Sequence, residues 1–160
     1  MIRPLRIGVI GSGAATEKQA TLARAAGVAI ARAEAITICG GMGGVMRAAA
    51  EGAASEGGTV VGILPGTDAA AAAPGVSIPL PTGLGEARNV LVARVSESVI
   101  AVGGEWGTLA EAAFCRKFGV PVIGLESNLP AGVADEAATG PIEAVARAVE
   151  LAEARRRSAP

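Results

Sequence analysis

Short β-type runs alternate with longer, alanine-rich helical segments along most of the chain, and this alternation constrains the fold more than any other feature. The first three runs occupy residues 5–10, 35–39 and 59–64, with helical segments expected at 17–32 and 44–56 between them. Consecutive strands that are joined by helices form βαβ units, which build a parallel sheet with helices on both faces. The pattern therefore predicts a doubly wound, Rossmann-like α/β fold with three layers, α/β/α.

The alternation pauses in a stretch rich in Pro, Gly and Ala at residues 65–83, where we expect a loop that holds one short strand near 76–79. The length of 160 residues suits one core and is too short for two ordinary domains, so we expect a single domain over residues 1–160. The remaining expected elements are a helix at 84–95, a strand at 98–103, a helix at 108–118, a strand at 120–125 and a last helix from Pro141.

Charge and hydropathy exclude several functional classes. The formal net charge is −1 and the only compact basic run is 155–157, so the chain lacks the positive field that nucleic acids attract. We therefore expect no nucleic-acid partner. No stretch of 18 uncharged apolar residues occurs, and the amino-terminal apolar run leads directly into glycines, so we expect a cytoplasmic protein without a membrane segment.

The side chains available for chemistry are limited, because the sequence contains no histidine. Histidine triads and histidine metal sites are thereby excluded. The two cysteines, Cys39 and Cys115, lie far apart without a second pair nearby, which argues against a metal knuckle or a disulfide scaffold. We expect no metal site and a buried position for Cys115, and whether this side chain faces a site stays open.

Glycines follow three of the expected strands, and in an open parallel sheet the carboxyl ends of the strands line one crevice. Backbone N–H groups at helix starts attract anions there, and glycine lets the backbone approach a ligand closely. Three such turns favour a phosphate-bearing ligand over a purely steric role, although each turn alone has both explanations. A dinucleotide is not expected, because the third glycine of the usual fingerprint and the acidic residue after the second strand are missing. The residues expected at this crevice are Gly11, Ser12, Gly40, Gly41, Gly43, Gly44, Gly103, Gly104 and Gly107.

The helix expected at 84–95 precedes a parallel strand, so its amino-terminal end should lie at the same edge as the glycine turns. Arg88 and Asn89 occupy its first turns. The planar guanidinium of Arg88 can clamp a phosphate or carboxylate, but it can equally pair with Glu86 or be solvated.

Two interpretations compete for Thr108 and Glu111. Their spacing is that of a capping box, in which the threonine hydroxyl and the glutamate side chain bind each other's backbone N–H. Thr16 and Gln19 form a second box of this kind with no claim to a site. The position of Glu111 at the crevice, opposite Arg88, instead favours a functional carboxylate. Beside it, Trp106 can stack on a ring or merely cover the loop.

Two blocks of the sequence resemble the LONELY GUY (LOG) and lysine-decarboxylase-like proteins. GGMGGVMRAAAEGAASEGGTVVGILPG at 40–66 is similar to their first block, and ARNVLVARVSESVIAVGGEWGTLAEAAFCRKFGVPVIGL at 87–125 to their second, which includes a GGxGTxxE motif. LOG enzymes cleave the N-glycosidic bond of cytokinin nucleoside 5′-monophosphates and release ribose 5-phosphate. The resemblance implies that Glu111 is the catalytic carboxylate and Arg88 its partner. It also implies a phosphate cradle and a nucleotide site formed by Gly103, Gly104, Gly107, Thr108, Gly40, Gly41, Gly43 and Gly44.

The chain departs from the LOG pattern at three places. Val102 replaces the usual proline, the two residues Glu105 and Trp106 stand where LOG enzymes have one, and Asn89 replaces a lysine. These changes resemble a short branch of the superfamily that includes molybdenum-cofactor carrier proteins, whose crevice binds a phosphorylated pterin without chemistry.

From these residues we expect a carrier or binding protein for a nucleotide or a molybdopterin-type cofactor. A nucleoside-monophosphate phosphoribohydrolase is the alternative, and the retention of Arg88 and Glu111 favours it. The resemblance and the alanine-rich helix surfaces further predict a homodimer or homotetramer.

Overall fold

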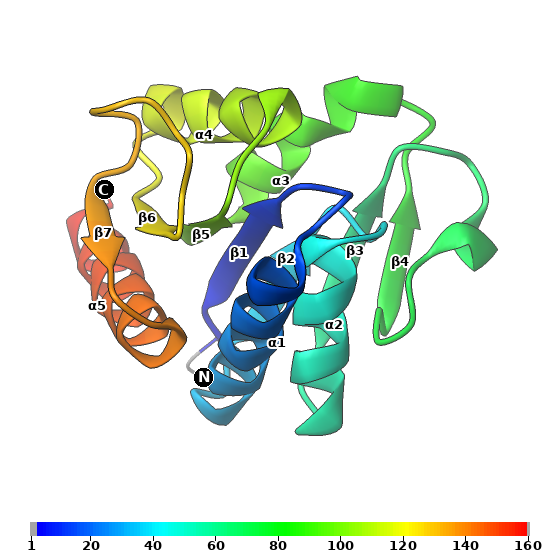
Figure 1. Cartoon of the computed structure of the whole chain (residues 1–160), viewed down its shortest axis with the longest axis horizontal. Coiled ribbons are helices and arrows are strands. Elements are labelled where there is room, and N and C mark those ends of the chain that lie inside the picture. Colours follow the sequence, from blue (N-terminus) through cyan, green and yellow to red (C-terminus); the bar gives the residue numbers. More distant parts are fainter. Residues whose placement is uncertain (1–2, 160) are drawn as a thin grey trace.

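A parallel sheet forms the middle layer of the molecule, as the computed structural model, which describes residues 3–159, shows (Figure 1). Its seven strands follow the order β4-β3-β2-β1-β5-β6-β7, and every pair is parallel. The strands are β1 Arg6–Gly11, β2 Ile36–Cys39, β3 Val60–Leu64, β4 Ile78–Pro81, β5 Ser98–Val102, β6 Val122–Leu125 and β7 Glu136–Ala138. The helices are α1 Glu17–Arg32, α2 Val45–Ser55, α3 Asn89–Val95, α4 Trp106–Phe118 and α5 Pro141–Ser158, with 3-10 turns η1 Ala69–Ala71 and η2 Gly85–Arg88.

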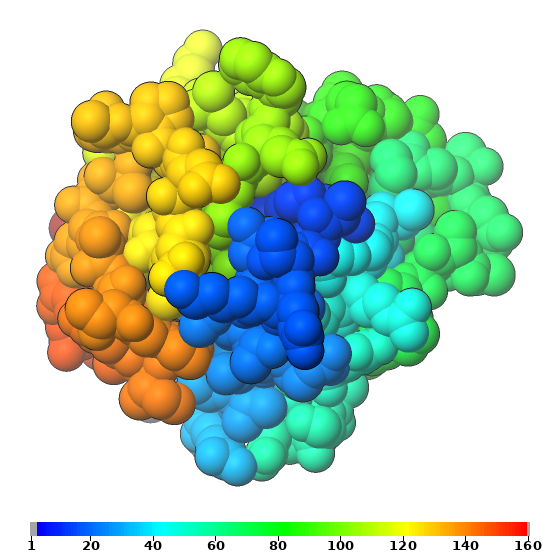
Figure 2. Space-filling view, viewed as in Figure 1, coloured from blue at the N-terminus to red at the C-terminus, as the bar shows by residue number. Residues whose placement is uncertain are grey.

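Two helical layers cover the sheet, which confirms the predicted doubly wound α/β fold. Helices α1, α2 and α5 pack on one face, and α3 and α4 on the other. The space-filling view shows the first of these faces closed by side chains (Figure 2). The core between the layers consists of Ile, Val, Leu and Ala, as expected for a chain with few aromatic residues.

Local sequence signals explain several element boundaries. Thr16 caps α1 in a complete capping box with Gln19, as predicted. Helix α4 ends at Phe118 and is capped by Gly119, whose φ of 66° is the left-handed conformation that terminates many helices. Pro141 occupies the first turn of α5, where its missing N–H costs nothing.

Several expectations about the elements were wrong in detail. The helix expected at 84–95 is divided into η2 and α3, and the short strand β4 lies two residues later than expected. The strand β7 at the edge of the sheet lies in a segment for which we expected no strand. These elements are short and have no clear periodic pattern of their own. Pairing with a neighbouring strand fixes β4 and β7, and hydrogen bonds to the end of β3 fix the start of η2.

The chain reverses its direction across the sheet between β1 and β5. After β1 it adds strands outward to β4, and then returns to place β5 on the other side of β1, where Gly11 pairs with Val102. Ligands of open α/β sheets bind at such a topological switch point, beyond the carboxyl ends of the strands. The fold therefore singles out the turns after β1 and β5 as the place to look for a site.

Candidate functional site

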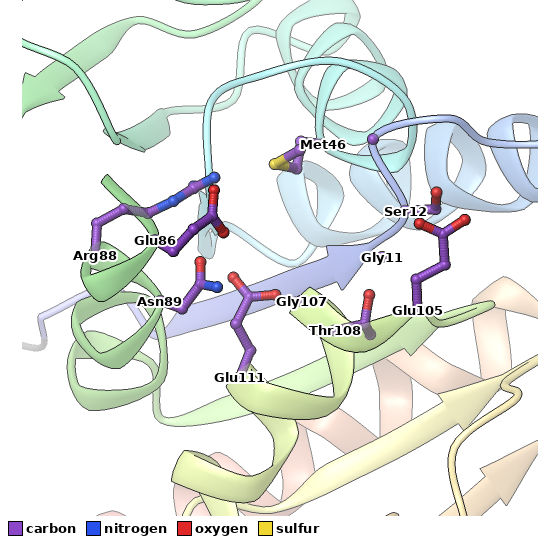
Figure 3. Close-up of a pocket in the computed structure, with 11 residues that line it drawn as sticks. Gly11, Ser12, Met46, Glu86, Arg88, Asn89, Glu105, Gly107, Thr108 and Glu111 are labelled. Carbon is purple, nitrogen blue, oxygen red and sulfur yellow. The ribbon is translucent and has the colours of Figure 1, made fainter. Parts of the chain in front are cut away.

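A cleft of about 200 Å³ opens at this switch point. It is bounded by the turn after β1, the start of α4 after β5, and the η2–α3 junction, with one side chain from α2 (Figure 3). The residues that line it are Gly11, Ser12, Gly13, Met46, Glu86, Arg88, Asn89, Glu105, Gly107, Thr108 and Glu111.

Arg88 is buried at one wall of the cleft, with 7% of its surface exposed. Its Nη1 donates to the carbonyl oxygen of Ile63 at 3.0 Å, while its Nε has no hydrogen-bond partner among the described residues. No ion pair in the described part of the chain includes this guanidinium. The surface ion pair with Glu86 that the sequence left open is therefore not formed, and a buried donor is left free at the cleft.

The loop that carries Arg88 is fixed to the end of β3. The Thr82 hydroxyl donates to the carbonyl oxygen of Leu64 at 2.7 Å, and the Gly85 N–H donates to that of Pro65 at 2.9 Å. These bonds set the start of η2, so that the next turn delivers Arg88 and Asn89 to the cleft. Both side chains were expected there from the sequence.

Thr108 and Glu111 do not form a capping box. Helix α4 begins two residues earlier than expected, at Trp106, with Glu105 in the N-cap position, so Thr108 lies inside the first turn. The Thr108 hydroxyl is buried and has no hydrogen-bond partner among the described residues. Helix capping therefore does not explain why Thr108 and Glu111 occur at these positions. Both side chains face the cleft instead (Figure 3).

Glu111 is a buried acid, with 7% of its surface exposed. Burial raises the pKa of its carboxyl group to about 8, because a charge is poorly solvated there; Arg88 opposes this rise, and Glu86 adds to it. At neutral pH the group is therefore mostly protonated. In this form it can donate a hydrogen bond to a ligand oxygen or act as a general acid.

The glycine runs fall into two groups. Gly11 and Gly107 line the cleft, whereas Gly40, Gly41, Gly43, Gly44, Gly103 and Gly104 do not, and their part in ligand binding stays a prediction. The structure gives some of the second group a packing role. A Cβ atom at Gly40 would lie 1.9 Å from Arg88 Nη1, and one at Gly44 would lie 2.1 Å from the carbonyl oxygen of Ser12.

The close packing at Gly44 joins the first two glycine turns. The carbonyl oxygen of Ser12 accepts a hydrogen bond from the N–H of Val45 at 3.0 Å, and the Ser12 hydroxyl accepts one from Ala14 at 3.0 Å. Ser12 thus braces the turn after β1 against the start of α2.

Four lining residues were not among the predicted site residues: Gly13, Met46, Glu86 and Glu105. Gly13, Glu86 and Glu105 lie within or next to motifs that the sequence had already placed at the crevice. Met46 likewise follows the second glycine run by two positions, and the packing of α2 against the end of β1 brings its side chain to the cleft.

Neither cysteine lines the cleft. Cys115 is fully buried in the apolar layer between α4 and the sheet, and burial raises its pKa to about 12. Within residues 3–159, no group of three His, Cys, Asp or Glu side chains is arranged to hold a metal ion. Over the same residues, no helix has the length and apolarity needed to cross a membrane.

The fold and this cleft define a Rossmann-like α/β protein with a polar pocket at the topological switch point. The model of the SLOG cluster4 family matches residues 4–154, and the chain belongs to this family. A relative from Archaeoglobus fulgidus, described as an uncharacterized protein, is 41% identical over 127 residues, which cover 76% of this chain and 80% of that protein.

Two solved structures share the whole fold. The Moco carrier protein from Chlamydomonas reinhardtii is 36% identical with a TM-score of 0.84, over 95% of this chain and 99% of that one. The molybdenum cofactor binding protein from the phototrophic bacterium Rippkaea orientalis is 31% identical with a TM-score of 0.83, over 96% and 98%. The chain thus lies in the branch that the altered motif had indicated.

Proposed function

We propose that the cleft binds a phosphorylated small molecule, specifically a molybdopterin-type cofactor, and that the protein acts as its carrier. The observation that carries this proposal is a pair of buried groups without partners, Arg88 Nε and Thr108 Oγ1, on opposite walls of the same cleft. Thr37 holds the third such atom among the described residues and does not line the cleft. A buried polar atom without a partner costs about 1–3 kcal/mol, so its retention at two points of one cleft supports a bound ligand.

The glycine at position 107 also fits a phosphate ligand. It lies in the first turn of α4, and a Cβ atom built there would meet nothing within 4 Å. Glycine inside a helix costs roughly 1 kcal/mol relative to alanine, and no packing or backbone strain requires it here. A ligand that approaches the free N–H groups of the helix start would require it.

The chain's own residues have distinct tasks in this proposal. Arg88 and the N–H groups at the start of α4 bind the phosphate, and the hydroxyl of Thr108 and the protonated carboxyl of Glu111 donate to its oxygens. The cofactor itself would supply the metal-binding dithiolene and the pterin ring. The two solved relatives, one called a carrier of this cofactor and one its binding protein, support this assignment over other phosphorylated ligands.

Anaerobic transfer of the cofactor from a denatured molybdoenzyme tests the carrier function. The wild type should retain the cofactor through gel filtration, and Arg88→Met should lose it. Arg47→Met is the matched control, because Arg47 on α2 is exposed, does not line the cleft and pairs with Glu51. Equal retention by both variants, or none by the folded wild type, would refute the proposal.

A second candidate function is the hydrolysis of nucleoside 5′-monophosphates, and the buried acid Glu111 favours it. A neutral carboxyl group can protonate the departing base, and its later ionised form can stabilise the oxocarbenium-like sugar. Chromatography of a panel of nucleoside 5′-monophosphates, including isopentenyl-adenosine monophosphate, would detect released base. Release by the wild type that vanishes in Glu111→Gln would establish the hydrolase; no release would leave the carrier.

We also propose that the chain is a single domain over residues 1–160, which assembles as a homodimer or homotetramer in the cytoplasm. One continuous sheet joins all the described strands, which supports the single domain. Exposed apolar side chains at one sheet edge and at the start of α5, among them Ile78, Leu80 and Ile142, support assembly. A monomeric mass in light scattering would refute the proposed homodimer or homotetramer.

A further inference from the structure

A second hollow, of about 310 Å³, lies next to the cleft, on the other side of the start of α4. Glu105 lines both the hollow and the cleft, so the two are neighbours across a single residue. The residues that line the hollow are Gly104, Glu105, Trp106, Leu109, Asn128, Leu129 and Pro130. Apart from Glu105 and Asn128 its side chains are apolar, whereas the cleft is mostly polar.

Trp106 is the most exposed large apolar residue of the described chain, with 85% of its surface accessible. It lies three residues before Leu109 on α4, so the two side chains share one side of the helix. The opposite side of the same helix carries Thr108 and Glu111 into the cleft. An indole left open beside a polar cleft provides a flat surface on which a planar ring can stack.

Glu105 occupies the N-cap position of α4. Its backbone carbonyl accepts a hydrogen bond from the N–H of Leu109 at 2.9 Å, but its side chain makes no capping hydrogen bond to the helix. Its exposed carboxylate stands at the cleft near Ser12 (Figure 3). An ionised carboxylate accepts hydrogen bonds and donates none, so it suits a ring edge that presents two N–H donors side by side. It repels a phosphate, which argues for a ring rather than an anion at this end of the site.

We propose that Glu105 and Trp106 form the ring-recognition half of the ligand site, specific for a 2-amino-4-oxopyrimidine ring such as that of a pterin or a guanine. The ring stacks on Trp106, its amino and ring N–H groups donate to Glu105, and the phosphate end crosses the start of α4 to Arg88 and Thr108. The two residues are those by which the turn after β5 departs from the LOG spacing. This inference rests on the proposed phosphate-binding function of the cleft.

Calorimetric titration with four probes tests the inference: 6-hydroxymethylpterin phosphate, GMP, AMP and ribose 5-phosphate. The wild type should bind the pterin phosphate and GMP about tenfold more tightly than AMP, which lacks the 2-amino-4-oxo edge. Glu105→Gln should remove this preference, and Glu153→Gln, an exposed glutamate on α5, should leave it intact. Between the two preferred probes, the tighter one identifies the natural ring.

Trp106 provides a second readout, because it is the only tryptophan of the chain. Its fluorescence should be quenched by GMP and unchanged by ribose 5-phosphate. Trp106→Ala should weaken GMP and AMP by a similar factor, about tenfold, and leave ribose 5-phosphate binding unaltered.

The outcomes distinguish failure of the ring site from failure of the proposed phosphate-ligand binding in the cleft. If ribose 5-phosphate and the ring-bearing probes all fail to bind, the proposed function fails and the inference fails with it. If ribose 5-phosphate binds but GMP and AMP bind equally, or Glu105→Gln has no effect, the ring site alone is refuted. If Trp106→Ala instead lowers the mass of an oligomer in light scattering, Trp106 belongs to an interface between copies, and the inference is overturned.

Discussion

Gly40 and Arg88 occupy neighbouring space so closely that a Cβ atom on the glycine would lie 1.9 Å from the Nη1 atom of the arginine. The glycine stands directly after β2, and the arginine ends η2, 48 positions further along the chain. The guanidinium passes over the bare backbone of Gly40 to reach the carbonyl oxygen of Ile63. The second glycine run therefore supports the site indirectly, by making room for Arg88.

This relationship predicts the effect of Gly40→Ala. The new methyl group must push the guanidinium away, which breaks its hydrogen bond to Ile63 and costs about 1–3 kcal/mol of stability. Phosphate-ligand affinity should fall roughly tenfold or more, because the clamp is displaced. Urea unfolding and calorimetry measure the two effects. Gly66→Ala, where a Cβ atom meets nothing within 4 Å, should change neither; unaltered affinity in Gly40→Ala would contradict the prediction.

The sequence predicted the layers of the fold because long periodic helices and buried strands carry their own signal. It missed β7 and the division between η2 and α3, because pairing at the sheet edge and bonds to the end of β3 fix these elements. The basic run near the carboxyl terminus illustrates the same limit. Arg156 binds the buried carboxylate of Glu97 and two backbone carbonyls at the start of the chain, which no local pattern indicates.

The site was predictable to the extent that parallel topology gathers strand ends. Arg88, Asn89 and Glu111 reach one cleft because the helix before β5 and the turn after it meet there. The sequence left the choice between cap and site open at Thr108, because a capping box depends on where the helix starts. The structure begins α4 at Trp106, and a shift of two residues decides between the alternatives.

Two threonines with the same spacing to a Gln or Glu allow a matched test of that choice. Thr16→Val removes a true cap, so it should destabilise the fold by about 1 kcal/mol without affecting ligand affinity. Thr108→Val removes a buried hydroxyl without a partner, so the fold should be as stable as the wild type or more so, while ligand affinity falls severalfold. Thermal unfolding and ligand titration of both variants provide the comparison. Destabilisation by Thr108→Val would instead support the interpretation of Thr108 as a helix cap.

A helix substitution separates ligand contact from packing at Gly107. Gly107→Ala should stabilise the fold by roughly 0.5–1 kcal/mol, because alanine favours the helix and the space is open, yet it should weaken phosphate-ligand binding about tenfold. Ala110→Gly, at an exposed position of the same helix, should cost a similar amount of stability and leave binding unchanged. Loss of stability without loss of binding in Gly107→Ala would show that the glycine serves the fold.

The buried carboxyl group of Glu111 makes stability depend on pH in a window that the pKa values define. In the folded state its pKa is about 8, whereas the ordinary value is 4.5. Between these values the unfolded chain has lost this proton and the folded protein retains it, so the folded state binds more protons and the free energy of unfolding falls as pH rises. The fall ends above the folded pKa, where both states are ionised. Its full size is at most about 5 kcal/mol, an upper bound for so buried a group.

Glu111→Gln tests this dependence directly. The amide cannot ionise, so the variant should lack the fall and should exceed the wild type in stability above roughly pH 8, while the two converge toward roughly pH 4.5. Urea unfolding at a series of pH values measures the difference, and Glu153→Gln should follow the wild type throughout. Ligand affinity should fall as the pH rises through about 8, for the wild type alone, because an ionised Glu111 repels a phosphate that its protonated form binds. Parallel stability profiles for the wild type and Glu111→Gln would mean that the carboxylate is already ionised at neutral pH, and Glu111 would then act as an acceptor or base in the cleft instead of a donor.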